Sequence, residues 1–132
     1  MKTTLLLVLV SVLAIVAAPA YSSEAMQMWK CEMDEDVTEQ QVLDMAQDWL
    51  KAAKTMEGGE NMTVTVYFPV AVNMAGDTDL LFVVHTPSFE EWGKFWDGYE
   101  DSPAAKVDQE NTENGGVCPD SAMWEAFRVE VE

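Results

Sequence analysis

Apolar residues after residue 20 follow first a strand-like and then a helical period. Residues 26–33, MQMWKCEM, alternate between apolar and polar positions, which predicts a strand. The spacing becomes helical after Thr38, which with Gln41 forms a capping box at the helix start. Gly58 and Gly59 are expected to end this helix. Its predicted apolar face consists of Val42, Met45, Ala46, Trp49, Leu50, Ala53 and Met56.

Two further strands are predicted in the middle of the chain. Residues 61–73 alternate over a long stretch, but Pro69 has no amide hydrogen to donate. This strand is therefore expected to lie at a sheet edge or to bulge at Pro69. Residues 80–85, LLFVVH, are apolar at almost every position, which is typical of a central strand covered on both faces.

The pattern then predicts a second helix, a short third helix and a last strand. Ser88 and Glu91 form another capping box, and Ser102-Pro103 marks a new helix start that runs to about residue 111. Residues 111–116, NTENGG, are predicted to be a loop, and residues 122–132 a strand. The second helix carries its bulky side chains on one broad face: Phe89, Trp92, Phe95, Trp96 and Tyr99.

The first twenty residues have the features of a secretory signal peptide. Lys2 precedes an apolar run over residues 5–18, and residues 18–20, APA, offer a cleavage site after Ala20 or within the next few positions. The run is shorter than the roughly 20 residues of a membrane-spanning helix. We therefore expect a signal peptide at 1–20, one domain at 21–132, and a protein exported to a periplasmic or extracellular compartment.

The order of the elements, β-α-β-β-α-β, is that of the ferredoxin-like class of α+β folds. This class has a four-stranded antiparallel sheet with both main helices on one face. Its last strand pairs with its first, which would bring Cys31 and Cys118 to the same end of neighbouring strands. The oxidising compartments that exported proteins reach favour a disulfide between them. Free thiols or a redox pair are less favoured, because the C-x-x-C spacing is absent.

The charge of the chain excludes several classes of partner. It has 24 acidic and seven basic residues, a net charge of −17, and every acidic residue lies after residue 20. Such a surface repels phosphate backbones and anionic lipids, so neither a nucleic acid nor a membrane is an expected partner. Acidic clusters at 34–36 and 97–101 suit a solvated surface, with cation binding as the alternative, and neither has EF-hand spacing.

From MQMWKCEM to FRVEVE, and above all in FVVHTPSFEEWGKFWDGYEDSP, the chain resembles the dimeric α/β-barrel superfamily, which includes antibiotic-biosynthesis-monooxygenase-like proteins. The resemblance implies a homodimer formed through the helix-free sheet faces and a ligand held between helices and sheet. Haem-degrading relatives need a histidine on the second helix, and this helix has none. The expected cleft is lined by Trp49, Trp92, Phe95, Trp96 and Tyr99, with hydroxyls supplied by Tyr67 and Tyr99.

His85 is the only histidine and the candidate general base, since its side chain titrates near neutrality. A hydrogen-bonded structural histidine is the alternative. With no second histidine and both cysteines paired, neither a transition-metal site nor a cofactor is expected. The aromatic residues likewise fit either a packed core or a cleft for a small apolar or aromatic ligand.

Three functions remain open from the sequence. The first is an exported binding or scaffold domain with an aromatic-lined cleft. The second is a cofactor-independent oxygenase or isomerase that acts on a small aromatic or polyketide-like substrate with His85 as base. The third is a structural or partner-binding module of the cell envelope. Whether the chain is an enzyme is not decided by its sequence.

Overall fold

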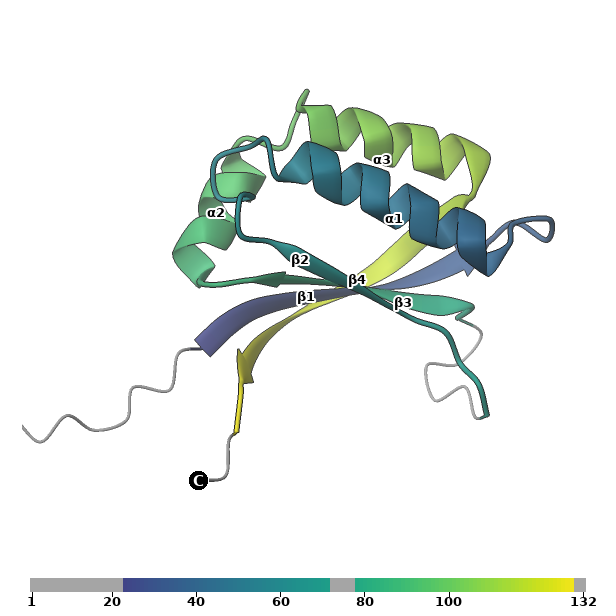
Figure 1. Ribbon diagram of the computed structural model, residues 1–132, viewed down its shortest axis with the longest axis horizontal. Helices are drawn as coiled ribbons and strands as arrows, with labels where there is room; N and C mark the ends of the chain where they lie inside the picture. The colour runs from purple at the N-terminus through teal and green to yellow at the C-terminus, as the bar shows by residue number, and fades with distance from the viewer. Residues whose placement is uncertain (1–22, 72–77, 130–132) are drawn as a thin grey trace, which may run out of the picture.

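The computed structural model describes residues 23–71 and 78–129, which form a four-stranded antiparallel sheet with three helices on one face (Figure 1). The signal peptide predicted at 1–20 lies outside these residues. The strands lie in the order β2-β3-β1-β4, as the ferredoxin-like class requires. In chain order the elements are β1 (Ser23–Met33), α1 (Glu39–Ala53), β2 (Thr63–Tyr67), β3 (Leu80–Thr86), α2 (Phe89–Asp97), α3 (Pro103–Asn114) and β4 (Gly116–Phe127).

The first and last strands pair along almost their whole length, from Ser23 opposite Phe127 to Met33 opposite Gly116. The register shifts between Lys30 and Glu32, where Cys118 and Pro119 lie opposite the single residue Cys31, so β4 bulges at this point. A disulfide joins Cys31 to Cys118 of β4 at this bulge and closes a sequence separation of 87 residues. The predicted pairing of the last strand with the first strand is confirmed, and the predicted disulfide is present.

The helices begin at the predicted caps. The Thr38 side chain accepts a hydrogen bond from the Gln41 amide, and the Gln41 side chain accepts one from the Thr38 amide at 2.9 Å. The hydroxyls of Ser88 and Ser102 accept in the same way from amides in the first turns of α2 and α3. Each cap satisfies an amide that has no partner within its helix, which fixes where the three helices start.

Side chains that alternate along the strands divide the sheet into two faces. On the helix face, one core cluster lies under α1 and α2 and a smaller one near the disulfide. The larger cluster contains Trp49, Ala53, Met56, Met62, Val84, Phe95 and Ala104, and the smaller one Cys31, Val42 and Leu80. Burial of these side chains supplies the main driving force that holds the helices on the sheet.

The opposite face carries no helix among the described residues (Figure 1). Apolar residues occupy its centre, where Met28 of β1 pairs with Val83 of β3 and with Ala122 of β4. Trp124 of β4 extends this surface and is 53% exposed. The end of the same face is polar and carries Glu24 and His85.

Two predicted boundaries near the C-terminus are wrong. α3 continues to Asn114, so most of the predicted loop at 111–116 is helical. Side-chain hydrogen bonds hold its last turns: Gln109 donates to Glu113, and Asn114 donates to the Glu110 carbonyl at 2.7 Å. β4 begins at Gly116, so Cys118 lies within the strand and not before it.

Two other elements are shorter than predicted. β2 ends at Tyr67, just before Pro69, and is an edge strand as the proline requires; residues 72–73 of the predicted strand lie outside the described part. α1 ends at Ala53, earlier than the stop predicted at Gly58. Thr55 ends it, since its amide and its hydroxyl both bond to the Ala52 carbonyl.

Candidate functional site

A cavity of about 330 Å³ lies between α1, α3 and the helix face of the sheet. β1 and β3 form its floor, α1 and α3 form its sides, and the start of β4 closes one end. The lining residues near solvent include Asp108, Thr112 and Cys118, all of which are exposed. The full lining consists of Trp29, Cys31, Met33, Val42, Met45, Ala46, Trp49, Leu80, Phe82, Trp96, Tyr99, Asp108, Asn111, Thr112, Gly116 and Cys118.

Contacting aromatic rings form the inner part of this cavity. The ring of Phe82 lies edge-on to Trp49, with 5.5 Å between ring centroids, and 5.9 Å from Trp29. Trp96 lies 6.0 Å from Trp29 and 4.4 Å from Tyr99. These distances are those of favourable edge and tilted ring pairs. The rings come from β1, β3, α1, α2 and the segment after α2, so the tertiary fold assembles the wall.

A chain of two hydrogen bonds runs along the cavity. The Trp49 indole Nε1 donates to the Tyr99 hydroxyl at 3.2 Å, and that hydroxyl donates to Asp108 Oδ2 at 3.1 Å. Burial, together with the nearby Asp108 carboxylate, raises the pKa of Tyr99 above its ordinary range, against the opposing effect of the Trp49 hydrogen bond. Tyr99 is therefore protonated at neutral pH and acts as a hydrogen-bond donor.

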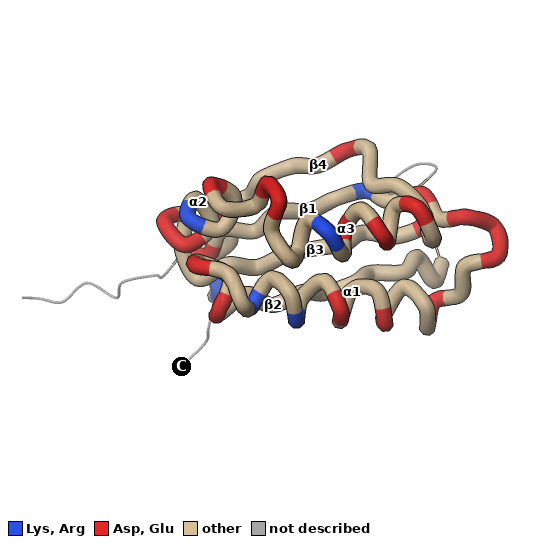
Figure 2. Tube along the Cα trace, turned by 90° about the horizontal axis from the view of Figure 1, so that it is seen from above, with Lys and Arg blue, Asp and Glu red and all other residues tan. Residues whose placement is uncertain are grey.

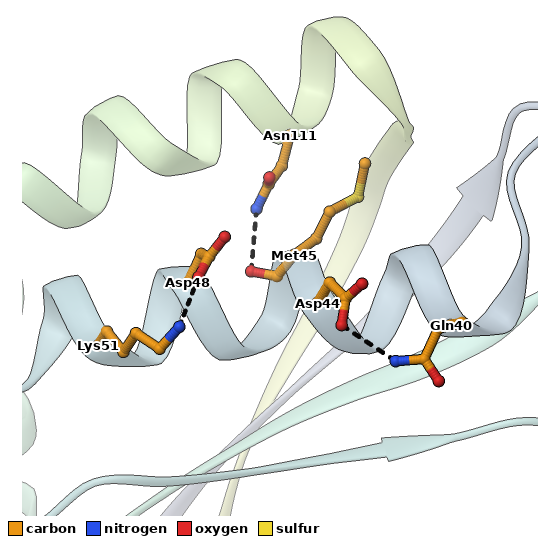
Figure 3. Close-up of polar contacts among 6 residues, drawn as sticks. All are labelled: Gln40, Asp44, Met45, Asp48, Lys51 and Asn111. Carbon is orange, nitrogen blue, oxygen red and sulfur yellow. Dashed lines mark hydrogen bonds and ion pairs between the residues drawn. The ribbon is translucent and has the colours of Figure 1, made fainter.

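The two helices that flank the cavity are joined directly above it. Asn111 Nδ2 of α3 donates to the Met45 carbonyl of α1 at 3.4 Å, and the Met45 side chain extends from α1 toward α3 (Figure 3). A side chain at Gly115 would collide with the Met45 thioether, so the end of α3 lies directly against it. These contacts set the width of the cavity.

The structure places the six predicted cleft residues in different surroundings. Trp49, Trp96 and Tyr99 line the cavity, whereas Phe95 is fully buried in the core cluster behind it. Trp92 is not among the lining residues, and its Nε1 donates to Gln27 Oε1 at 3.0 Å. Tyr67 lies on the helix-free face of the sheet, because it pairs with Leu81 of β3.

Several lining residues were not predicted. Trp29 and Phe82 pair with each other on the inward side of β1 and β3, and the continuous apolar run around Phe82 did not indicate which face it lies on. Asp108 and Asn111 lie on a helix that was predicted, but nothing in its weakly patterned sequence indicated which side faces the cavity.

His85 lies on the other side of the sheet from the aromatic cavity. Its Nδ1 is 3.7 Å from Glu24 Oε2, and its side chain is 26% exposed. Both residues line a second pocket of about 340 Å³, whose other lining residues are Asn61, Thr63, Thr65, Thr86, Pro87 and Arg128. The predicted base therefore cannot reach a ligand held between the helices and the sheet.

The described part of the chain has neither a metal-binding cluster nor a membrane-spanning helix. There, no three histidine, cysteine, aspartate or glutamate side chains are grouped as a metal ion would need. None of the helices at 23–71 and 78–129 is both long and apolar enough to cross a membrane.

Comparison with known proteins gives matches at the level of structure only. No protein-family model and no curated protein sequence matches this chain. Hydroxynitrile lyase from Passiflora edulis superposes with a TM-score of 0.55 at 10% identity, covering 84% of this chain and 98% of the lyase. A protein from Arabidopsis thaliana gives 0.53 at 8% identity, with coverages of 83% and 98%. At such identities the likeness shows a shared fold, and it carries no information about activity.

Proposed function

We propose that this protein is an exported binding domain of the dimeric α/β-barrel superfamily, which holds a small, largely apolar ligand between α1, α3 and the sheet. The observation that carries the proposal is the aromatic cavity of about 330 Å³. Its volume lies in the range of small-molecule sites, roughly 300–1,000 Å³, and such sites are mostly apolar with a few convergent polar groups. Here those groups are Tyr99, Asp108 and Asn111.

The arrangement of the rings favours a binding role over a packing role. Phe95 is fully buried and contacts Trp49, Trp96 and Tyr99, so the core is already closed behind the cavity. The rings that face the cavity are additional to this packed layer. Close packing is the rule in protein interiors, so a space of this size beside a packed core is best explained by an occupant.

Energy transfer from tryptophan to an uncharged aromatic probe, N-phenyl-1-naphthylamine, tests the proposal. Trp29, Trp49 and Trp96 line the cavity, so a bound probe should quench their emission in a saturable way. Trp96→Phe should raise the dissociation constant of the probe, whereas Trp92→Phe, the matched change outside the lining, should leave that constant almost unchanged. Ala46→Leu should weaken binding because its side chain enters the cavity.

Melting curves recorded for each variant separate loss of binding from loss of the fold. The binding proposal fails if the probe does not quench the tryptophan emission of the wild type, or if the dissociation constant of the probe is unchanged in a folded Ala46→Leu variant. The chain would then be a structural or partner-binding module of the cell envelope.

We also propose that two copies of the chain pair through their helix-free sheet faces. An antiparallel sheet in water normally has one polar face. Here the uncovered face carries Met28, Leu81 and Trp124, and Trp124 is half-exposed. A contiguous apolar surface of this kind is typical of a protein interface.

An isomerase or cofactor-independent oxygenase with His85 as base is the second candidate. It is favoured by the proximity of His85 to Glu24 in a pocket that also contains Arg128. Such an enzyme would bind its substrate in this polar pocket and not in the aromatic cavity. His85→Gln should then abolish turnover. It should leave the quenching of tryptophan emission by the naphthylamine probe unchanged, since the two sites are on opposite faces of the sheet.

A further inference from the structure

We infer that the ligand of the aromatic cavity is an organic cation whose charged nitrogen carries methyl or aryl groups. This inference rests on the proposed binding role of the cavity and adds the chemical class of the ligand. It is carried by the combination of rings and charge at the cavity, which neither the apolar character nor the volume of the site would indicate.

The charge at the cavity is of one sign. Asp108 is the only charged residue among the described residues that line it. The chain as a whole has a net charge of −17. Acidic residues lie along α1, along α3 and in the turn between β1 and α1 (Figure 2). A field of this sign attracts cations to the mouth of the cavity and repels carboxylates, phosphates and phenolates.

The wall of the cavity suits a weakly hydrated cation. Five aromatic residues line it, and three of them are tryptophans, the side chain with the strongest cation–π attraction. A primary ammonium would need hydrogen-bond acceptors on all sides, because a buried donor without a partner is costly. A quaternary ammonium, whose nitrogen carries four carbon groups, has no N–H and so no such requirement. Rings and thioethers such as those of Met33 and Met45 can therefore surround it.

Asp108 is placed to balance the charge of such a ligand. Its carboxylate accepts a hydrogen bond from Tyr99, which holds it at the same end of the cavity as Trp96. A carboxylate has about four acceptor positions, so this single bond leaves its negative charge in place. The cavity thus combines an aromatic enclosure with one fixed counter-charge.

Three probes of nearly the same shape test the inference by tryptophan quenching at 150 mM salt. They are the (3-hydroxyphenyl)trimethylammonium cation, its uncharged analogue 3-tert-butylphenol, and the 3-tert-butylbenzoate anion. The cation should bind about tenfold more tightly than the uncharged analogue, because the rings and the carboxylate both favour it. The anion should bind most weakly.

A matched pair of variants separates the site from the overall charge. Asp108→Asn should weaken binding of the cation about threefold and leave 3-tert-butylphenol unaffected. Glu110→Gln removes the same charge from the same helix, but Glu110 does not line the cavity. It should change cation binding by less than about 1.5-fold, because distant exposed charges are screened at this salt concentration.

The outcomes distinguish this inference from the proposed function. If the uncharged analogue or the anion binds at least as tightly as the cation, the cavity is a binding site but the inferred class of ligand is wrong. Equal losses in the two variants would also overturn it, since the attraction would then come from the overall charge alone. If none of the three probes binds although N-phenyl-1-naphthylamine does, the inferred class of ligand is wrong and the binding role stands; if the naphthylamine does not bind either, the binding role itself fails.

Discussion

The indole nitrogen of Trp49 donates a hydrogen bond of 3.2 Å to the hydroxyl of Tyr99, although the two residues are 50 positions apart in the chain. Trp49 is on α1, and Tyr99 follows the end of α2. The Tyr99 hydroxyl in turn donates to Asp108 of α3. One hydroxyl group therefore connects α1 and α3 to the segment that follows α2, at the wall of the cavity.

Replacing Tyr99 with phenylalanine should lower the free energy of unfolding by about 1–2 kcal/mol. The substitution leaves the indole N–H of Trp49, a residue that is only 5% exposed, without its acceptor. Urea denaturation measures the change. Tyr67→Phe, at a half-exposed tyrosine on the other face of the sheet, is the control and should change stability by less than about 0.5 kcal/mol. Equal effects of the two substitutions would contradict the role assigned to the hydrogen-bond chain.

Alkaline pH should destabilise the protein through the same residue. The pKa of Tyr99 is raised in the folded protein, whereas an unfolded tyrosine titrates at about 10. The folded state thus retains a proton that the unfolded state loses, so stability falls as the pH rises above about 10. Rapid thermal melts between pH 8 and 11 should show this fall in the wild type. In Tyr99→Phe the fall should be shallower.

Removing the disulfide should cost much of the stability of the domain. For a loop of 87 residues, the chain-entropy model gives roughly 4–5 kcal/mol, and measured values are often smaller. The double variant Cys31→Ala, Cys118→Ala should therefore unfold at a markedly lower urea concentration than the oxidised wild type. Wild-type protein treated with a reductant should match the double variant. A reduced protein as stable as the oxidised one would mean that pairing of β1 with β4 does not depend on the bond.

Trp124→Glu should convert the proposed dimer into a monomer. Trp124 is half-exposed on the helix-free face, and a buried unpaired charge at an interface is strongly unfavourable. Sedimentation equilibrium gives the mass of each species. Leu43→Glu is the matched control, since Leu43 is 44% exposed on α1 on the helix side of the sheet. A monomeric wild type, or a monomeric control, would count against the proposed interface.

The mature protein should begin close to Tyr21. Expression with the complete leader in a secreting host, followed by mass spectrometry of the intact product, gives the cleavage position. The expected mass corresponds to loss of residues 1–20 or of two or three residues more. A product that retains Lys2 and the apolar run would show that the segment is not removed.

Local sequence signals were sufficient for the elements and their order. The caps at Thr38, Ser88 and Ser102 placed the helix starts correctly, because each depends on contacts within three residues. Pro69 indicated an edge strand for a local reason as well. Element order then implied which strands are neighbours, and this neighbour relation brought the two cysteines together.

Boundaries and the site depended on contacts that the sequence does not display. α3 extends to Asn114 partly because Asn111 bonds to a carbonyl of α1, a partner 66 positions away. The cavity combines rings from four elements and from the segment after α2, whereas Tyr67 lies with Thr63 and Thr65 on the other face of the sheet. His85 and the tryptophans are close in the sequence but are separated by the sheet.

The sulfur atoms that join β1 to β4 have a second role, because Cys31 and Cys118 both belong to the cavity lining. A thiol-reducing environment would break the covalent link between the bulge in β4 and the neighbouring strand β1, and so loosen one end of the enclosure. Reduction of this one bond should therefore weaken binding in the cavity, and reoxidation should restore it.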